Sequence, residues 1–128
     1  MADQKRILIA DDDPELLELL KTALGYQNHE ITPVSDGRQA LQTALSGKFD
    51  LLILDVMMPY IDGYHVAHEI SDKLGEKCPP ILIMSSRDVQ KEKGIALMSG
   101  AEAILQKPFG IAAFQSKVAE ILKRPQAQ

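Results

Sequence analysis

The chain has 128 residues, 45% hydrophobic and 25% charged, which is typical of one soluble globular domain. Its formal net charge of −4 argues against non-specific binding to nucleic acid or to an anionic membrane. No apolar run is long enough to span a bilayer, the start MADQKR lacks a signal-peptide pattern, and the single cysteine, Cys78, fits a reducing compartment, so we expect a cytoplasmic protein.

Short apolar runs alternate with helical patterns along the chain. This alternation predicts an α/β fold with a parallel sheet covered by helices on both faces. We expect one domain over 1–128, with its core at about 5–123 and a frayed tail or the start of a linker at 124–128. The predicted strands are 6–10, 29–34, 51–55, 81–85 and 103–106, and the predicted helices are about 14–24, 37–46, 63–74, 88–99 and 109–123.

The first predicted helix has residues at its ends that favour helix boundaries. Asp13 can cap it, with Pro14 at its first position and Gly25 just past its end. Four leucines follow at helical spacing and are expected to pack in the core: Leu16, Leu17, Leu20 and Leu24.

Pro33 lies inside the second predicted strand. Because proline cannot donate a hydrogen bond to a sheet, this strand is expected at an edge. The flavodoxin-like, doubly wound order 2-1-3-4-5 places the second strand there. The sequence therefore favours a five-stranded parallel sheet of that order.

Polar residues follow the apolar strands at their carboxyl ends, where ligands bind in open parallel sheets. Two carboxylates about 4 Å apart repel by roughly 4 kcal/mol at an effective dielectric constant near 20, so neighbouring acids require a cation. Oxygen ligands without histidine or thiol favour a hard ion such as Mg²⁺, and acids with a metal, a lysine and a hydroxyl suit phosphoryl transfer. The residues at the strand ends are Asp11, Asp12 and Asp13, then Asp55, then Ser85 and Ser86, then Gln106 and Lys107.

Four motifs, in order and each at the end of a predicted strand, resemble the receiver domain of two-component response regulators. The resemblance covers about residues 5–123. It implies a signalling domain that catalyses only its own phosphorylation and dephosphorylation. The motifs are DDDP, LILDVMMPYIDG, ILIMSS and LQKPF.

The resemblance assigns roles to individual residues. It implies that Asp55 accepts phosphate from the phosphohistidine of a histidine kinase and that Asp11 and Asp12 form the acidic pair for Mg²⁺. Ser85 matches the switch hydroxyl, with Ser86 as the competing hydroxyl, and Lys107 matches the phosphate-binding lysine.

Further details follow from the same resemblance. The backbone carbonyl of Met57 would complete the metal ligands. The Lys107–Pro108 bond would be cis, and Asp62–Gly63 matches the turn into the third helix.

Three positions depart from the family pattern or tune it. Ile104 stands where many receivers have an aromatic residue that moves inward on phosphorylation, so we expect the fourth helix to respond more than the fifth strand. Met57 and Arg87 are at the positions that flank the path of the hydrolytic water in the family. We therefore expect this pair to set the lifetime of the phosphoryl group.

The fourth predicted helix, DVQKEKGIALMSG, has apolar residues around its circumference. Packing on the sheet and a partner or dimer surface are both consistent with this pattern. In the family, the fourth helix, fifth strand and fifth helix form the usual output surface. The resemblance thus implies a sensor histidine kinase or phosphotransfer protein upstream, a downstream protein or output domain, and a possible homodimer through that surface.

Two other functions compete with the receiver. A hydrolase of the haloacid dehalogenase type would use the Asp11 and Asp13 pair, with Asp11 as nucleophile, but Glu15 stands where that family usually has threonine or valine. The second is a receiver-fold scaffold that acts without phosphorylation. Ile104 is compatible with it, but it is disfavoured by four intact residues, Asp12, Asp55, Ser85 and Lys107.

Overall fold

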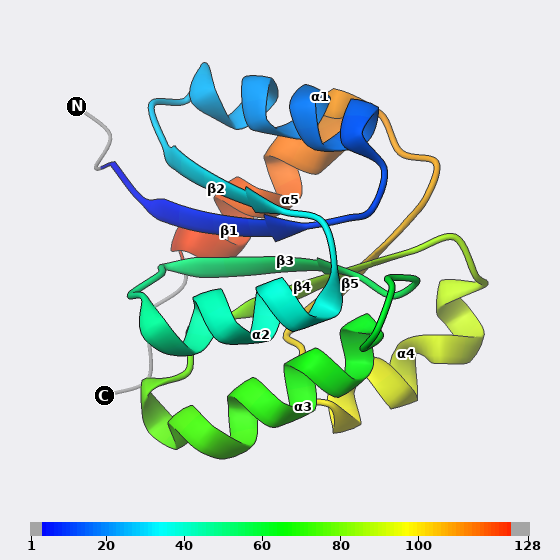
Figure 1. Cartoon of the computed structure of the whole chain (residues 1–128). Helices are drawn as coiled ribbons and strands as arrows, with labels where there is room; N and C mark the ends of the chain where they lie inside the picture. The colour runs from blue at the N-terminus through cyan, green and yellow to red at the C-terminus, as the bar shows by residue number, and fades with distance from the viewer. Residues whose placement is uncertain (1–3, 124–128) are drawn as a thin grey trace.

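The computed structural model describes residues 4–123, where five β-strands alternate with five α-helices (Figure 1). The strands are β1 (Arg6–Ala10), β2 (Glu30–Val34), β3 (Leu51–Asp55), β4 (Ile81–Ser85) and β5 (Ala103–Gln106). The helices are α1 (Pro14–Gly25), α2 (Gly37–Ser46), α3 (Gly63–Leu74), α4 (Val89–Met98) and α5 (Ile111–Lys123), with a short 3-10 turn at Gly75–Lys77. Every predicted element is present, and each end lies within two residues of its predicted position.

The five strands form one parallel sheet in the order β2-β1-β3-β4-β5. This is the predicted flavodoxin-like order. Pro33 lies on β2 opposite Ile9 of β1, and β2 is an edge strand of the sheet. The missing amide hydrogen of the proline is therefore tolerated, as the sequence predicted.

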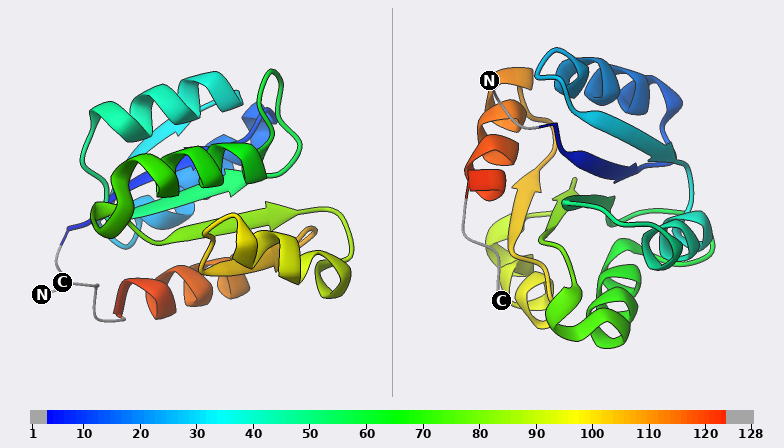
Figure 2. Two further views of the ribbon diagram at one scale, coloured as in Figure 1. Left: turned by 90° about the horizontal axis from the view of Figure 1, so that it is seen from below. Right: turned by 90° about the vertical axis from the view of Figure 1, so that its left-hand side faces the viewer.

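Helices cover both faces of the sheet. In the views of Figures 1 and 2, α1 and α5 lie on one face, and α2, α3 and α4 lie on the other. Alternate residues of each strand point to opposite faces, so Ile7 and Ile9 join the core under α1 and α5, whereas Leu8 and Ala10 join the other core. The strands read as unbroken apolar runs because both sides of the sheet are buried.

The core under α1 and α5 contains the leucines predicted from helical spacing. Leu20 and Leu24 are fully buried, and Leu16 and Leu17 pack at the periphery of the same cluster. From α5 come Phe114, Val118 and Ile121, all fully buried. Burying side chains of this size contributes about 1.5–3 kcal/mol each, so this face anchors α5 firmly.

The end of α1 differs from the prediction. Gly25 is the last helical residue, not the residue beyond the helix, and Tyr26 follows it in a right-handed helical conformation. The amides of Gln27 and Asn28 continue to bond to the carbonyls of Leu24 and Gly25. The chain therefore reverses only at Asn28, which has a φ of 65°.

The described part of the chain ends at the last turn of α5. The predicted tail 124–128 lies outside the described residues, and the extent of the domain stays a prediction. Within residues 4–123, no helix combines the length and apolar character that a membrane crossing requires.

Gly63 allows a close approach at the edge of the sheet that carries the acids. It is the first residue of α3, and its amide donates to the Val56 carbonyl at 2.9 Å. A β-carbon at this position would lie closer than 3.0 Å to the backbone carbonyl group of Asp55. The absence of a side chain therefore lets α3 start directly against the end of β3.

We expect Gly63→Ala to lower the free energy of unfolding by about 2 kcal/mol, because backbone atoms cannot move aside as a flexible side chain would. Urea denaturation measures the change. Gly94→Ala is the matched control, since nothing lies within 4 Å of a β-carbon added there in α4. This control should stabilise the protein by about 0.5–1 kcal/mol, and a similar loss in both variants would contradict the packing argument.

Candidate functional site

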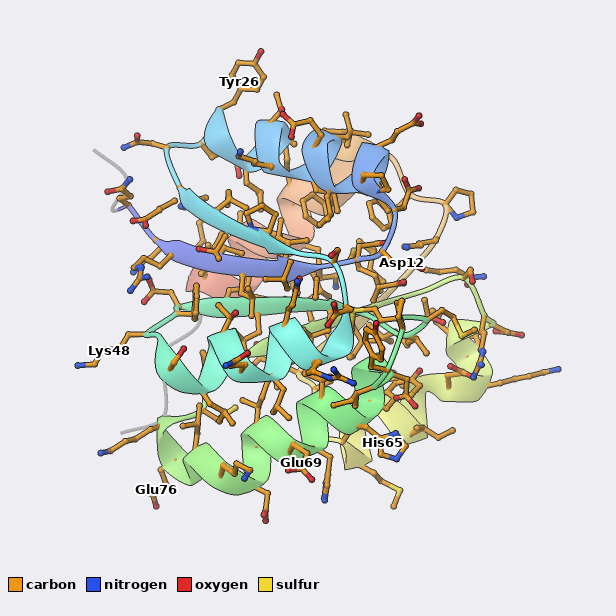
Figure 3. All side chains as sticks on the ribbon, viewed as in Figure 1. Asp12, Tyr26, Lys48, His65, Glu69 and Glu76 are labelled. Atoms are coloured by element: carbon orange, nitrogen blue, oxygen red, sulfur yellow. The ribbon has the colours of Figure 1, made fainter. Side chains whose placement is uncertain are left out.

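Three carboxylates meet at the carboxyl ends of β1 and β3. These strands are adjacent, with Ala10 opposite Leu54, so the residues that end them are neighbours in space. Asp11 is fully buried and Asp55 is 4% exposed, whereas Asp12 is on the surface of the same edge (Figure 3). Their carboxylate oxygens lie within 4.8 Å of one another. The topology therefore produces the acidic cluster that the sequence predicted.

Lys107 reaches this cluster from the end of β5, an edge strand of the sheet. It follows β5, and its Nζ lies 2.7 Å from Oδ2 of Asp11 and 3.0 Å from Oδ1 of Asp55. Its backbone amide donates to the Ser85 carbonyl at 2.7 Å, and the Lys107–Pro108 peptide bond is cis. The ammonium group thus lies between the two buried acids.

One ammonium group does not neutralise the cluster. Burial, followed by the charge of Asp11, raises the pKa of Asp55 to about 6 despite its hydrogen bond to Lys107. Burial alone would lower the pKa of Lys107, but its hydrogen bonds to Asp11 and Asp55 raise it above the ordinary value. Three carboxylates facing one lysine leave a formal excess of two negative charges when all four groups are ionised.

Asp13 has a different task from the other two acids of the DDDP motif. Its Oδ1 accepts from the amides of Glu15 at 3.0 Å and Leu16 at 3.3 Å, so it caps α1 as predicted. The Asp13 amide in turn donates to Oδ1 of Asp11 at 2.9 Å. Capping thus accounts for Asp13 without a second catalytic acid of the dehalogenase type.

The two candidate hydroxyls lie in different surroundings. Ser85 ends β4, is fully buried, and its Oγ accepts from the amide of Arg87 at 3.0 Å. Ser86 is exposed and lines a cavity of about 360 Å³ with Lys107 and Pro108. Ser85 is therefore the hydroxyl held in a fixed position at the end of its strand.

Met57 and Arg87, predicted as a pair, are in contact. Nη2 of Arg87 lies 3.3 Å from Sδ of Met57, and both residues line a cavity of about 460 Å³ together with Asp12. Met57 is 54% exposed, and its side chain is apolar. The pair thus lies at the mouth of the acidic site.

Two residues in this region were not predicted from the sequence. The hydroxyl of Tyr64 in α3 donates to Oε1 of Glu92 in α4 at 2.6 Å, and Oε2 of Glu92 lies 3.4 Å from Nη1 of Arg87. Tyr64 and Glu92 are 28 positions apart and belong to no motif. Only the packing of α3 beside α4 could have identified them.

Ile104 occupies the position that is aromatic in many receivers. It packs at the periphery of the core under α2, α3 and α4, and it lines a cavity of about 290 Å³ with Leu97 and Lys117. An aliphatic side chain here has no ring or hydroxyl that could exchange partners. This surrounding is consistent with the expectation that β5 responds less than α4.

The donor set of the cluster fits a hard divalent cation. Asp11, Asp12 and Asp55 offer only oxygen atoms, and neither imidazole nor thiol is among the three clustered groups. An added dication would also balance the excess of negative charge that Lys107 leaves. The residues present therefore match the preferences of Mg²⁺.

Comparisons with known proteins agree with this geometry. Residues 7–119 match the family model described as the response regulator receiver domain. The chain is 34% identical over 119 residues to response regulator MprA of Mycolicibacterium vanbaalenii, which covers 93% of this chain and 51% of that protein. It is 33% identical over 120 residues to the alkaline phosphatase synthesis transcriptional regulatory protein PhoP of Bacillus subtilis, covering 94% of this chain and 49% of that one.

A solved structure with the same fold extends the similarity to three dimensions. The response regulator protein TrrA of Thermotoga maritima, in complex with Mg²⁺ and BeF, superposes with a TM-score of 0.82 at 33% identity, over 92% of this chain and 99% of that one. The chain spans about half the length of the two curated relatives. A family match over most of the chain, together with these relatives, shows that the chain belongs to the response regulator receiver domains of two-component systems.

Proposed function

We propose that Asp55 accepts a phosphoryl group from the phosphohistidine of a sensor histidine kinase or a phosphotransfer protein. The observation that carries this proposal is the placement of Lys107, whose Nζ lies within 3.0 Å of Asp55 and 2.7 Å of Asp11. A cation fixed beside a buried carboxylate suits a site where a more highly charged group will form. The pKa of Asp55, about 6, leaves most of this carboxylate ionised at neutral pH and ready to attack.

The transfer would form one bond and break another. An oxygen of Asp55 attacks the phosphorus atom, the phosphorus–nitrogen bond to the donor histidine breaks, and the imidazole leaves with the electron pair of that bond. The product is an acyl phosphate on Asp55. Lys107 would then share its protons between Asp11 and the new phosphoryl oxygens, because its ammonium already contacts Asp55.

Mg²⁺ fits this proposal as the cofactor. Asp11, Asp12, Asp55 and the backbone carbonyl of Met57 would hold it, and the bound ion would neutralise phosphoryl oxygens during transfer. The TrrA structure is a complex with Mg²⁺ and BeF, which supports Mg²⁺ as the cofactor here. The remaining chemistry belongs to the residues of this chain.

The signal to downstream partners would arise from the charge that phosphorylation adds at Asp55. A phosphoryl group carries about −1.5 to −2 charges near pH 7, by analogy with phosphorylated hydroxyls. Ser85 can donate its hydroxyl hydrogen to it, because in the present structure Oγ serves as an acceptor for Arg87. Movement of the β4–α4 connection would then alter the surface of α4, β5 and α5, where Leu97 is 55% exposed.

That surface would receive a downstream protein or an output domain, or a second copy in a homodimer. We place the domain in the cytoplasm, with its core at about residues 5–123 and no direct contact to nucleic acid. A scaffold that acts without phosphorylation is the remaining candidate. The convergence of Asp11, Asp55 and Lys107 favours a phosphoacceptor. A domain that is never phosphorylated would gain nothing from two buried carboxylates that repel each other.

The first test is labelling by acetyl phosphate in the presence of Mg²⁺. We expect one acyl phosphate per chain, and Asp55→Asn should reduce labelling by about a hundredfold or more, because an amide is a far poorer nucleophile. Asp72→Asn, an exposed acid on α3, is the control and should label normally. Label found on Asp11 would favour the hydrolase, and absence of any label would favour the scaffold.

The charge of Asp55 also predicts how stability depends on pH. Its pKa is about 6 in the folded protein against a reference value of 3.8, so between these values the folded state binds more protons than the unfolded state. The stability that this group contributes is therefore present below pH 4 and is lost as the pH rises to 6.

Without Mg²⁺, Asp55→Asn should consequently raise the free energy of unfolding at pH 7.5 by about 1 kcal/mol or more, since one pKa unit corresponds to about 1.4 kcal/mol. This gain should shrink towards zero near pH 4. Urea denaturation at the two pH values measures it, with Asp72→Asn as control. A gain of equal size at both pH values would show that the charge is not its cause.

Met57 allows a test of phosphate lifetime. Its exposed thioether cannot orient a water molecule for attack on the acyl phosphate, whereas an amide can. Met57→Asn should therefore speed loss of the phosphoryl group by about threefold to tenfold, measured as decay of labelled protein after the donor is removed. Met57→Leu, which keeps the apolar character, should decay like the wild type, and equal lifetimes in all three proteins would reject the role of Met57.

A further inference from the structure

Arg87 places a second cation at the mouth of the site, and the structure shows it held by other groups. Its guanidinium contacts Glu92 and Met57, whereas Asp11 and Asp55 are held by Lys107. Arg87 and Asp12 nevertheless line the same cavity of about 460 Å³. The guanidinium is therefore near the acids, but it contacts Glu92 and Met57 instead of them.

Glu92 has two partners of unequal strength. Its Oε1 accepts from the hydroxyl of Tyr64 at 2.6 Å, a short bond to a charged acceptor. Its Oε2 lies 3.4 Å from the guanidinium of Arg87, whose side chain is 53% exposed. At this distance, and with the guanidinium largely in water, solvent screening leaves the attraction weak. Glu92 is thus held firmly by Tyr64 and itself holds Arg87 loosely.

The hydrogen bond from Tyr64 would also stabilise the Glu92 carboxylate after Arg87 has moved away. The Glu92 side chain is only 14% exposed, so a carboxylate without any partner would be costly there. Burial and the hydrogen bond to Glu92 raise the pKa of Tyr64, and its hydroxyl stays protonated as a donor. Glu92 therefore keeps one strong hydrogen bond whether or not Arg87 remains beside it.

The backbone of Arg87 is tied to the proposed switch hydroxyl. Its amide donates to Oγ of Ser85 at 3.0 Å. If Ser85 turned towards a phosphoryl group on Asp55, this hydrogen bond would be given up. The same event that creates an anion in the site would then free the backbone that carries the guanidinium.

We propose that Glu92 and Tyr64 are positioning residues that hold Arg87 outside the site while Asp55 is unmodified, and that Arg87 exchanges Glu92 for the phosphoryl oxygens when Asp55 is phosphorylated. The proposal rests on the proposed function, since it requires an anion on Asp55. Glu92 lies in the first turn of α4, which starts at Val89. The exchange would thus release the start of α4 from the β4–α4 connection, and it requires no aromatic residue at Ile104.

The test measures the affinity for beryllofluoride, a phosphoryl mimic, at fixed Mg²⁺ by titration monitored with amide NMR signals. Arg87→Ala should weaken binding by about tenfold, because the mimic loses a cation. Glu92→Gln keeps the bond to Tyr64 but removes the charge that competes for Arg87, so it should tighten binding by about fivefold. Tyr64→Phe leaves Arg87 as the remaining described side-chain partner of Glu92 and should weaken binding by about threefold.

Glu92→Gln should increase the affinity for the mimic and Tyr64→Phe should decrease it. Opposite effects of these two variants distinguish exchange from simple loss of structure. In the Arg87→Ala background, Glu92→Gln should have no further effect, which a double-mutant cycle measures. Glu69→Gln, an exposed acid on α3, is the matched control and should bind like the wild type. As a second measurement, the side-chain Nε signal of Arg87 should shift when the mimic saturates the wild type.

The outcomes separate the two proposals. If the wild type binds the mimic with Asp55 intact but Glu92→Gln weakens binding or leaves it unchanged, the exchange is wrong and the phosphoacceptor role stands. An effect of Glu92→Gln that persists without Arg87 would also overturn the exchange. If the wild type fails to bind the mimic at all, both the phosphoacceptor role and the exchange are overturned.

Discussion

The ammonium group of Lys107 between Asp11 and Asp55 is the interaction on which the site depends. Two acids in a nearly dry position repel each other, and the cation reduces this repulsion without removing it. The arrangement requires β1, β3 and β5 to end at the same edge with their carboxyl ends aligned. The parallel sheet and its buried faces can therefore be understood as the support that keeps these three side chains together.

Much of this architecture could be predicted because its determinants are local. Asp13 and Pro14 start α1 through capping and a fixed φ, and Pro33 places β2 at an edge because it lacks an amide hydrogen. Once the strand order is known, the geometry of parallel sheets brings Asp55 and Lys107 to the same edge, at the carboxyl ends of the strands. The acidic cluster and its cation were predictable from sequence for this reason, although the short distances between them were not.

Other features depend on contacts between distant segments and had no signal in the sequence. Gly25 looked like the residue after a helix, but hydrogen bonds of the following amides delay the reversal to Asn28. Tyr64 and Glu92 meet only because α3 packs beside α4, and neither residue is unusual in its own segment. Arg87 was predicted near the site, yet its contact with Glu92 could not be derived from spacing.

Under the proposed function, the difference between α4 and α5 explains how a phosphoryl group on Asp55 would change the surface of the domain. Three fully buried side chains anchor α5, so moving it would cost several kcal/mol. Ala96 is the one buried residue of α4, and Met98 is 86% exposed, so a shift of α4 loses little apolar burial. Polar contacts of its first turn, such as that of Glu92 with Arg87, therefore contribute more to fixing the position of α4. A charge that competes for those contacts can therefore move α4 while the sheet and α5 stay fixed.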